Sequence, residues 1–315
     1  AQIGLALADA ARLSLDGQIR PAPGVLPAPA EALLGERLQL ALTATRTGPQ
    51  RLVIEDLRAS AALASLRGSG RLDGEAERVV ANAALRIDDL APLGRALEAP
   101  LVGSLQLDAD VDGPLLRPEG RLRLEATDLA AAEVAVAELQ TTLDLAMLDR
   151  LDRRGAMLQV VAEGTARALR LPDDVALPPQ DVAWQGELRA PVDRVGTATL
   201  ERLAVSADHL RLTAQGAFDA STLGGEARLE LALDALAPFA EAYGQAISGA
   251  AALEGNLELS AGAEVIGIDL YGRASELGGL PEGIGDLVGA APTLEANAVV
   301  APDERIEVTH LRVAG

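Results

Sequence analysis

The sequence comprises 315 residues, carries a formal net charge of −20 and is 49% hydrophobic. Its 27 basic residues are all arginines and are outnumbered by 47 acidic residues, which disfavours nucleic-acid binding because that function requires a concentrated basic face. The sequence contains no cysteine, which excludes disulfides, thiol nucleophiles and cysteine-based metal sites. No apolar run reaches the roughly 18 residues of a transmembrane helix. Both ends of the sequence look like internal positions of a longer protein.

Aromatic residues make up only 2% of the chain. A globular core of this size normally uses aromatic side chains as large fillers. The apolar mass here consists instead of leucine, valine and alanine. Such a composition suits either a narrow repetitive core or a surface in contact with hydrocarbon chains.

The segment Gly120–Leu129 shows the pattern that predicts the fold. Leu122 and Leu124 alternate with Arg121 and Arg123. A strand turns successive side chains to opposite faces, so this segment has one aliphatic and one charged face, whereas a helix would scatter the charges around its surface. A strand with one dry and one wet face is typical of an antiparallel sheet.

Taken in chain order, this alternation predicts many strands and a few short helices. Helices are expected at 28–34, at 91–98, where Pro92 follows Asp89 at a favourable first-turn position, and at 237–247. The strands are expected at 3–15 (one or two strands), 38–45, 50–58, 63–72, 79–87, 101–111, 120–127, 133–146, 156–170, 182–189, 196–206, 208–219, 226–234, 250–260, 264–274, 294–300 and 305–313.

An internal repeat underlies this order of elements. A shift of 146 positions aligns LRIDDLAPL at 85–93 with LALDALAPF at 231–239, and it aligns Gly103 with Gly249. The same shift aligns Asp73 with Asp219. The sequence therefore predicts that 1–315 is one elongated fragment that contains two long modules, at about 54–199 and 200–315.

Two parts of the sequence resemble a known family. The segment at 90–113, which recurs at 236–255, and the segment at 111–145, with its order of glycine, proline, short strand, small-residue turn and long strand, are similar to the TamB family. TamB proteins are the inner-membrane-anchored subunits of the translocation and assembly module, and they belong to the wider AsmA-like group of repeating β-groove proteins. The resemblance covers most of the chain and rests on patterns of leucine and glycine.

This resemblance implies a long sheet curled into an open trough with an aliphatic lining. It also implies a periplasmic bridge between the inner and outer membranes, anchored to the inner membrane by a segment outside this sequence. The implied roles are the movement of phospholipid and support of outer-membrane protein assembly. A BamA-family barrel protein of the outer membrane is a candidate partner, through parts outside this sequence.

We therefore predict an all-β fold: an elongated, mainly antiparallel sheet curled into an open apolar trough, with a few short helices at module boundaries. Phospholipid acyl chains are expected to lie on the aliphatic face while their headgroups project to water. The predicted lining consists of leucines at alternate positions beside polar neighbours, and it is expected to form one continuous concave face: Leu105, Leu107, Leu122, Leu124, Leu143, Leu145, Leu229, Leu231, Leu233, Leu257 and Leu259.

No catalytic residue, metal site or cofactor is predicted, and we expect the protein not to be an enzyme. His209 and His310 are the only histidines, and they lack the spacing of a zinc site. The alternating aspartates at 108–112 lack the loop and the terminal glutamate of a calcium-binding EF-hand.

Two alternatives to lipid transport stay open. A β-helix enzyme acting on polysaccharides needs paired carboxylates across a cleft, and usually aromatic platforms for sugar rings, of which this sequence has almost none. A structural β-solenoid scaffold or protein-interaction module would contain the same strands, with the apolar face sealed internally.

Overall fold

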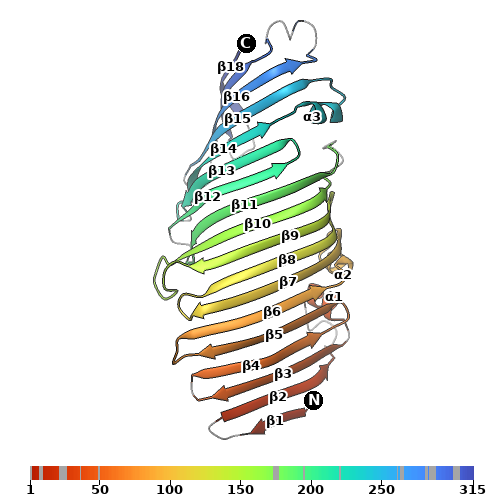
Figure 1. The fold of residues 1–315 in the computed structure, drawn as a ribbon, viewed down its shortest axis with the longest axis vertical. Helices are drawn as coiled ribbons and strands as arrows, with labels where there is room; N and C mark the ends of the chain where they lie inside the picture. The colour runs from red at the N-terminus through yellow and green to blue at the C-terminus, as the bar shows by residue number, and fades with distance from the viewer. Residues whose placement is uncertain are drawn as a thin grey trace. The chain divides into compact units, whose positions relative to one another are not determined.

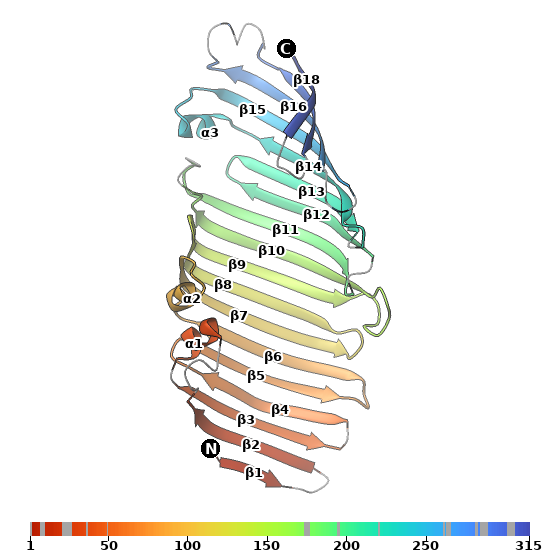
Figure 2. The same ribbon diagram turned by 180° about the vertical axis from the view of Figure 1, so that it is seen from behind.

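The computed structural model describes residues 2–6, 10–20, 27–35, 37–48, 50–172, 177–193, 196–219, 221–260, 262, 266–280, 283, 289–300 and 306–315. In this part of the chain, β-strands follow one another through short connections, with three short helices between them (Figures 1 and 2). The chain forms two compact units. Unit 1 consists of Ala1–Asp152 and Gly164–Leu169, and unit 2 consists of Arg153–Glu163 and Arg170–Gly315.

Unit 1 is a sheet in which each strand from β1 to β9 pairs antiparallel with the next one in sequence. Helices α1 (Ala28–Leu34) and α2 (Ala91–Ala96) contact each other at one end of these strands (Figure 2). The strands are β1 (Gln2–Ala6), β2 (Ala10–Ile19), β3 (Leu38–Thr47), β4 (Arg51–Ser60), β5 (Ala64–Asp73), β6 (Arg78–Ile87), β7 (Leu101–Pro114), β8 (Glu119–Ala131) and β9 (Val134–Met147).

Unit 2 is built in the same way, with each strand from β11 to β18 antiparallel to the next. It contains helix α3 (Ala237–Ala242). Strand β10 (Met157–Leu169) has residues in both units. The strands of unit 2 are β11 (Gln180–Pro191), β12 (Thr197–Ala207), β13 (Leu210–Asp219), β14 (Gly224–Leu233), β15 (Ser248–Leu259), β16 (Ile266–Gly278), β17 (Thr293–Val300) and β18 (Ile306–Ala314).

The predicted all-β class and antiparallel pairing are confirmed. Each strand expected from the alternation is present, and the segment at 3–15 forms two strands, with residues 7–9 outside the described part of the chain. The helix at 28–34 is confirmed. The prediction of a helix at 237–247 is wrong in length. The observed helix ends at Ala242, and Gly244, which adopts a left-handed φ of 69°, prevents it from continuing.

The offset of 146 residues recurs in the backbone hydrogen bonds. In unit 1 the N–H of Leu90, just before α2, donates to the carbonyl oxygen of Gly103 at 2.8 Å. In unit 2 the N–H of Leu236, just before α3, donates to Gly249 at the same distance. Each helix is therefore fixed to the strand that follows it by an equivalent bond.

Gly103 and Gly249 also mark equivalent β-bulges. Both glycines have a φ of 115°, which L side chains rarely adopt, and the strand register shifts at each of them. A Cβ at Gly103 would lie 2.7 Å from the carbonyl oxygen of Asp128, and one at Gly249 would lie 2.6 Å from that of Ser275. Only glycine fits both the backbone conformation and the close approach of the neighbouring strand.

The described residues contain few buried side chains. The buried apolar residues are mostly alanines, together with Ile87, Leu90, Val136 and Met147, and no large side chain among them is completely buried. The accessible surface is 19553 Å² for a mass of 32.4 kDa. Two compact globular domains that share this mass would expose only about 15,000 Å². The units therefore behave as single layers of sheet, not as sandwiches with a closed core.

Candidate functional site

Six of the predicted lining leucines lie on one face of unit 1. Residues directly opposite each other in an antiparallel pair project to the same face. Leu107 is opposite Leu124, Leu122 is opposite Leu143, and Leu105 and Leu145 follow at the alternate positions of the same strands. Their shared surface is called here the aliphatic face of unit 1.

The aliphatic face of unit 1 extends beyond the predicted residues. A row of directly paired apolar residues crosses six strands, from β3 to β8: Leu40, Ala59, Leu66, Leu85, Leu107 and Leu124. A second row joins Ala64, Ile87, Leu105, Ala126 and Leu139 across β5 to β9. Pairing in register thus converts the alternation within each strand into continuous aliphatic rows across the sheet.

The other five predicted leucines lie together on the aliphatic face of unit 2. Leu231 is opposite Leu212 and Leu253, while Leu257 is opposite Ala227 and Ile268. Leu229 and Leu233 share the face of Leu231, and Leu259 shares that of Leu257. The predicted lining residues therefore form two groups, one in each unit.

These leucines are neither fully buried nor fully exposed. All eleven keep an intermediate part of their surface accessible. On β18 the exposure is greater, with Leu311 64% accessible. A packed core would bury leucine side chains more completely than these are buried.

The opposite face of each sheet is ionic. Arg123 stands opposite Asp108 in register, on the far side of the sheet from Leu124. Arg78 donates to both carboxylate oxygens of Asp112 at 2.8 and 2.9 Å. In unit 2, Arg228 lies 3.3 Å from the carboxylates of both Glu230 and Glu254. We call these surfaces the polar faces.

Both faces carry pockets. On the polar faces, a pocket of about 700 Å³ in unit 1 lies near Arg67 and Asn82, and one of about 620 Å³ in unit 2 lies near Asn256 and Asp269. On the aliphatic face of unit 2 there is a smaller pocket, of about 370 Å³. We call it the apolar pocket; it is lined chiefly by Leu188, Ala198, Leu200, Phe218, Leu257 and Ile266.

Two glycines form part of the wall of the apolar pocket. A Cβ at Gly216 would lie 2.5 Å from the carbonyl oxygen of Glu226, and one at Gly225 would lie 2.5 Å from that of Ala217. The two strands approach too closely here for a side chain. The absence of side chains leaves the space that Phe218 and its aliphatic neighbours surround.

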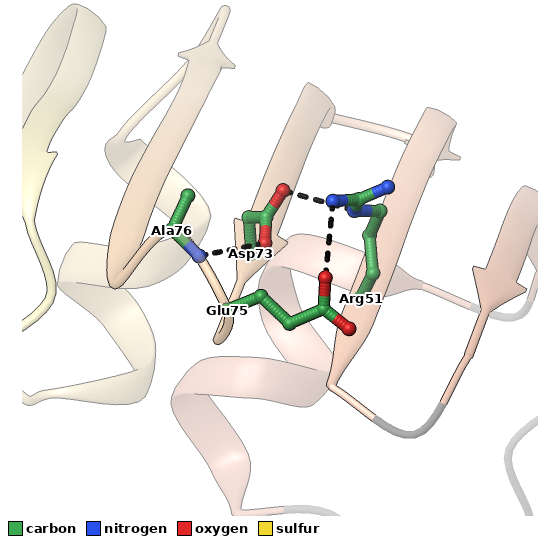
Figure 3. Close-up of polar contacts among 4 residues, drawn as sticks. All are labelled: Arg51, Asp73, Glu75 and Ala76. Carbon is green, nitrogen blue, oxygen red and sulfur yellow. Dashed lines mark hydrogen bonds and ion pairs between the residues drawn. The ribbon is translucent and has the colours of Figure 1, made fainter.

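Carboxylates with altered acidity lie in turns and not in the pockets. Asp73 accepts the N–H of Ala76 at 3.1 Å, and Arg51 lies 2.9 Å from Asp73 and 3.7 Å from Glu75 (Figure 3). The bond from Ala76, aided by Arg51, lowers the pKa of Asp73. The pKa of Asp219 is likewise lowered, because its carboxylate accepts bonds from the hydroxyl and N–H of Ser221. These groups stabilise hairpin turns.

The two histidines occupy different places in unit 2. His310 is exposed and stands opposite Asn297, and His209 is half-buried in the turn before β13. No group of three or more metal-ligating side chains occurs among the residues that the structure describes. Within the same residues, no helix has the length and apolar character needed to cross a membrane.

Sequence reasoning missed the apolar pocket and the residues that line it. Phe218, Leu188 and Leu200 lie in predicted strands, but their meeting depends on which residues of neighbouring strands stand opposite each other. One signal was present in the sequence. Gly216 lies within the strand predicted at 208–219, where glycine often marks the close approach of another backbone or a ligand.

Comparisons of the chain with models of protein families, with curated proteins and with solved structures yield no match.

Proposed function

We propose that this protein binds phospholipid along its aliphatic faces and carries it between membranes. The observation that supports the proposal is the set of aliphatic rows that cross the strands of each unit and whose leucines stay partly accessible. Burying apolar surface contributes about 25 cal/mol per Å², so such a face binds hydrocarbon in preference to water. A lipid chain gains about 0.8 kcal/mol per buried methylene.

The composition of the aliphatic faces favours movement of a bound lipid along them. Leucine, valine and alanine form most of the rows, and polar residues such as Thr141 are exceptions on them. Without hydrogen-bonding groups at fixed places, an acyl chain is held by contact area and moves with little hindrance. The ionic opposite face keeps each sheet hydrated.

The resemblance to the TamB family extends the proposal. In that reading the protein is periplasmic, is anchored to the inner membrane by a segment outside this sequence, bridges to the outer membrane and supports assembly of proteins there. A BamA-family barrel protein is the candidate partner. Catalysis forms no part of the proposal.

The single tryptophan of the chain provides a direct test. Trp184 is opposite Val205, whose other partner is Leu212, so its side chain belongs to the aliphatic face of unit 2. Phosphatidylcholine with brominated acyl chains should quench the fluorescence of Trp184. Native mass spectrometry of the purified protein should also detect non-covalently bound phospholipid.

A matched control uses the neighbouring residue on the same strand. Gln185 is exposed and points to the polar face. In the double variant Trp184→Phe, Gln185→Trp, the same brominated lipid should leave the fluorescence unchanged. Equal quenching of both proteins, or a delipidated protein that takes up no lipid, would reject lipid carriage in favour of a scaffold.

A further inference from the structure

The polar face of unit 2 carries a hollow of about 620 Å³, which is called here the polar pocket. This volume falls in the range of small-molecule sites, roughly 300–1,000 Å³. A row of directly opposite residues crosses it: Gln215, Arg228, Asn256, Asp269 and Asn297. Arg228 and Asn256 precede Leu229 and Leu257 on their strands, so the row projects to the side of the sheet opposite to the aliphatic face.

A hollow occurs at the equivalent place in unit 1. The offset of 146 residues aligns residues of the 700 Å³ pocket there with residues of the polar pocket: Glu55 with Glu201, Ser69 with Gln215, Asn82 with Arg228, Asp110 with Asn256, and Arg123 with Asp269. The strand register shifts beside both hollows, at 54–57 and at 200–203. Bulges of this kind redirect side chains and are frequent beside functional sites. The repeat therefore preserves the position of the hollow while its lining changes.

The polar pocket contains donors and acceptors that no protein group uses. The side-chain amides of Gln215 and Asn256 have no hydrogen-bonding partner among the residues that the structure describes. The carboxylates of Glu226 and Glu258, which stand opposite each other, likewise have no partner within those residues. In the unit 1 hollow, by contrast, the amide of Asn82 already donates to the hydroxyl of Ser69 at 3.0 Å.

An exposed aromatic ring adjoins this set of polar groups. Tyr271 lies two residues after Asp269 on β16, on the same face of the sheet, which places it about 7 Å farther along the strand. Its side chain is 48% exposed. A tyrosine ring in this position can stack on the C–H face of a sugar while its hydroxyl stays in water.

The mixture of groups selects the chemistry of the ligand. A polyamine only donates hydrogen bonds and leaves the N–H groups of the two free amides unmatched. A phosphate or another anion only accepts them, and it is repelled by Glu226 and Glu258. Arg228 does not offset this repulsion, because it already lies 3.3 Å from the carboxylates of Glu230 and Glu254. A hydroxyl group both donates and accepts, so it matches amides and carboxylates together.

We infer that the polar pocket of unit 2 binds a neutral oligosaccharide. The amides of Gln215 and Asn256 exchange hydrogen bonds with its hydroxyl groups. Asp269, oriented by a hydrogen bond from Asn297, accepts from a further hydroxyl. A neighbouring sugar ring stacks on Tyr271. The inference is independent of lipid carriage, because the pocket and the aliphatic face lie on opposite sides of the sheet.

Saturation-transfer NMR of the purified protein with cellotetraose, maltotetraose and N-acetylchitotetraose tests the ligand class. At least one of these neutral probes should bind, and its affinity should be the same at low and high salt, because it carries no charge. Tetragalacturonate, an anionic counterpart, should bind several-fold more weakly. The variant Glu226→Gln, Glu258→Gln should keep the affinity for the neutral probe, since glutamine retains an acceptor at each position.

Two matched pairs of exposed residues test the place of binding. Asn256→Ala should weaken binding of the neutral probe several-fold, whereas Asn82→Ala, in the equivalent hollow of unit 1, should leave it unchanged. Tyr271→Ala should also weaken binding several-fold. Its control is Tyr243→Ala, at the end of α3, where the side chain is 58% exposed.

The outcomes separate this inference from the proposed function. Failure of all three neutral probes to bind overturns it, as does spermine that binds more tightly than they do and is released by high salt. Binding that survives both Asn256→Ala and Tyr271→Ala, or that falls equally in the control variants, overturns the site. None of these results bears on lipid carriage, which the quenching of Trp184 tests separately.

Discussion

Asp73 and Asp219 perform the same structural task in two hairpins that lie 146 residues apart. Asp73 ends β5 and accepts the N–H of Ala76 in the turn to β6, while Asp219 ends β13 and accepts the N–H of Ser221 in the turn to β14. The sequence repeat therefore extends to the hydrogen bonds that close equivalent turns.

The shared role of these aspartates predicts an acid-dependent loss of stability. Both carboxylates have a pKa below the ordinary 3.8, so their charged forms stabilise the folded state above that pH, and this contribution disappears as the pH falls through the lowered pKa. In the variant Asp73→Asn, Asp219→Asn, the unfolding temperature should be lower at neutral pH and should match the wild type near pH 2. Thermal unfolding at a series of pH values measures the effect.

The control for this experiment is Asp110→Asn, which removes a carboxylate from the middle of a strand. Its unfolding temperature should follow the wild type more closely across the series. A deficit in the double variant that is the same at every pH would contradict the role assigned to the two charges.

The bulge glycines should tolerate no side chain. Gly103→Ala and Gly249→Ala each force alanine into a φ of 115° and place its Cβ within 2.7 Å of a backbone oxygen. Each substitution should lower the free energy of unfolding by about 1–3 kcal/mol. Gly186→Ala is the matched control, since its Cβ would meet its nearest neighbours at 3.6 Å. Denaturant titration should show little change for the control, and equal losses at all three positions would refute the argument.

A charge on the aliphatic face separates a lipid carrier from a sealed scaffold. Leu124 is half-buried between Leu107 and Thr141, so the long side chain of Leu124→Arg can reach water from an open face. The variant should fold, at a cost of about 1–3 kcal/mol, while lipid transfer between vesicles falls several-fold.

Arg123→Leu, on the polar face of the same strand, should transfer lipid at the wild-type rate. A Leu124→Arg protein that transfers lipid normally would exclude carriage along this face. One that fails to fold would indicate a packed core and favour the scaffold.

The ion pairs of the polar faces should contribute little to stability. One guanidinium nitrogen of Arg78 donates to both carboxylate oxygens of Asp112, but the two side chains are 57% and 59% exposed. Exposed pairs contribute about 0–1 kcal/mol because water screens them. Asp112→Asn should therefore change the unfolding free energy by less than about 1 kcal/mol. A loss several times larger in denaturant titration would mean that the pair organises the hairpin between β6 and β7.

Much of the fold could be predicted because alternation is a local property. Leu122 and Arg123 take opposite faces whatever strand lies beside them, so the strands and their two faces follow from the sequence. The apolar pocket could not be predicted in this way, because Phe218 meets Gly225 only through the register between β13 and β14. The end of α3 was also missed, since Gly244 ends the helix where the apolar pattern continues.

The pairing of every strand in unit 1 with its neighbours in sequence has a consequence for how the protein acquires its structure. Each hairpin needs only residues that are close along the chain, so little loop-closure entropy is lost when the next strand is added. A chain that emerges gradually during synthesis can extend the sheet one strand at a time. At every stage of that growth the newest strand presents a row of unpaired N–H and C=O groups, and until its successor arrives this edge is where a growing chain is most prone to pair with another.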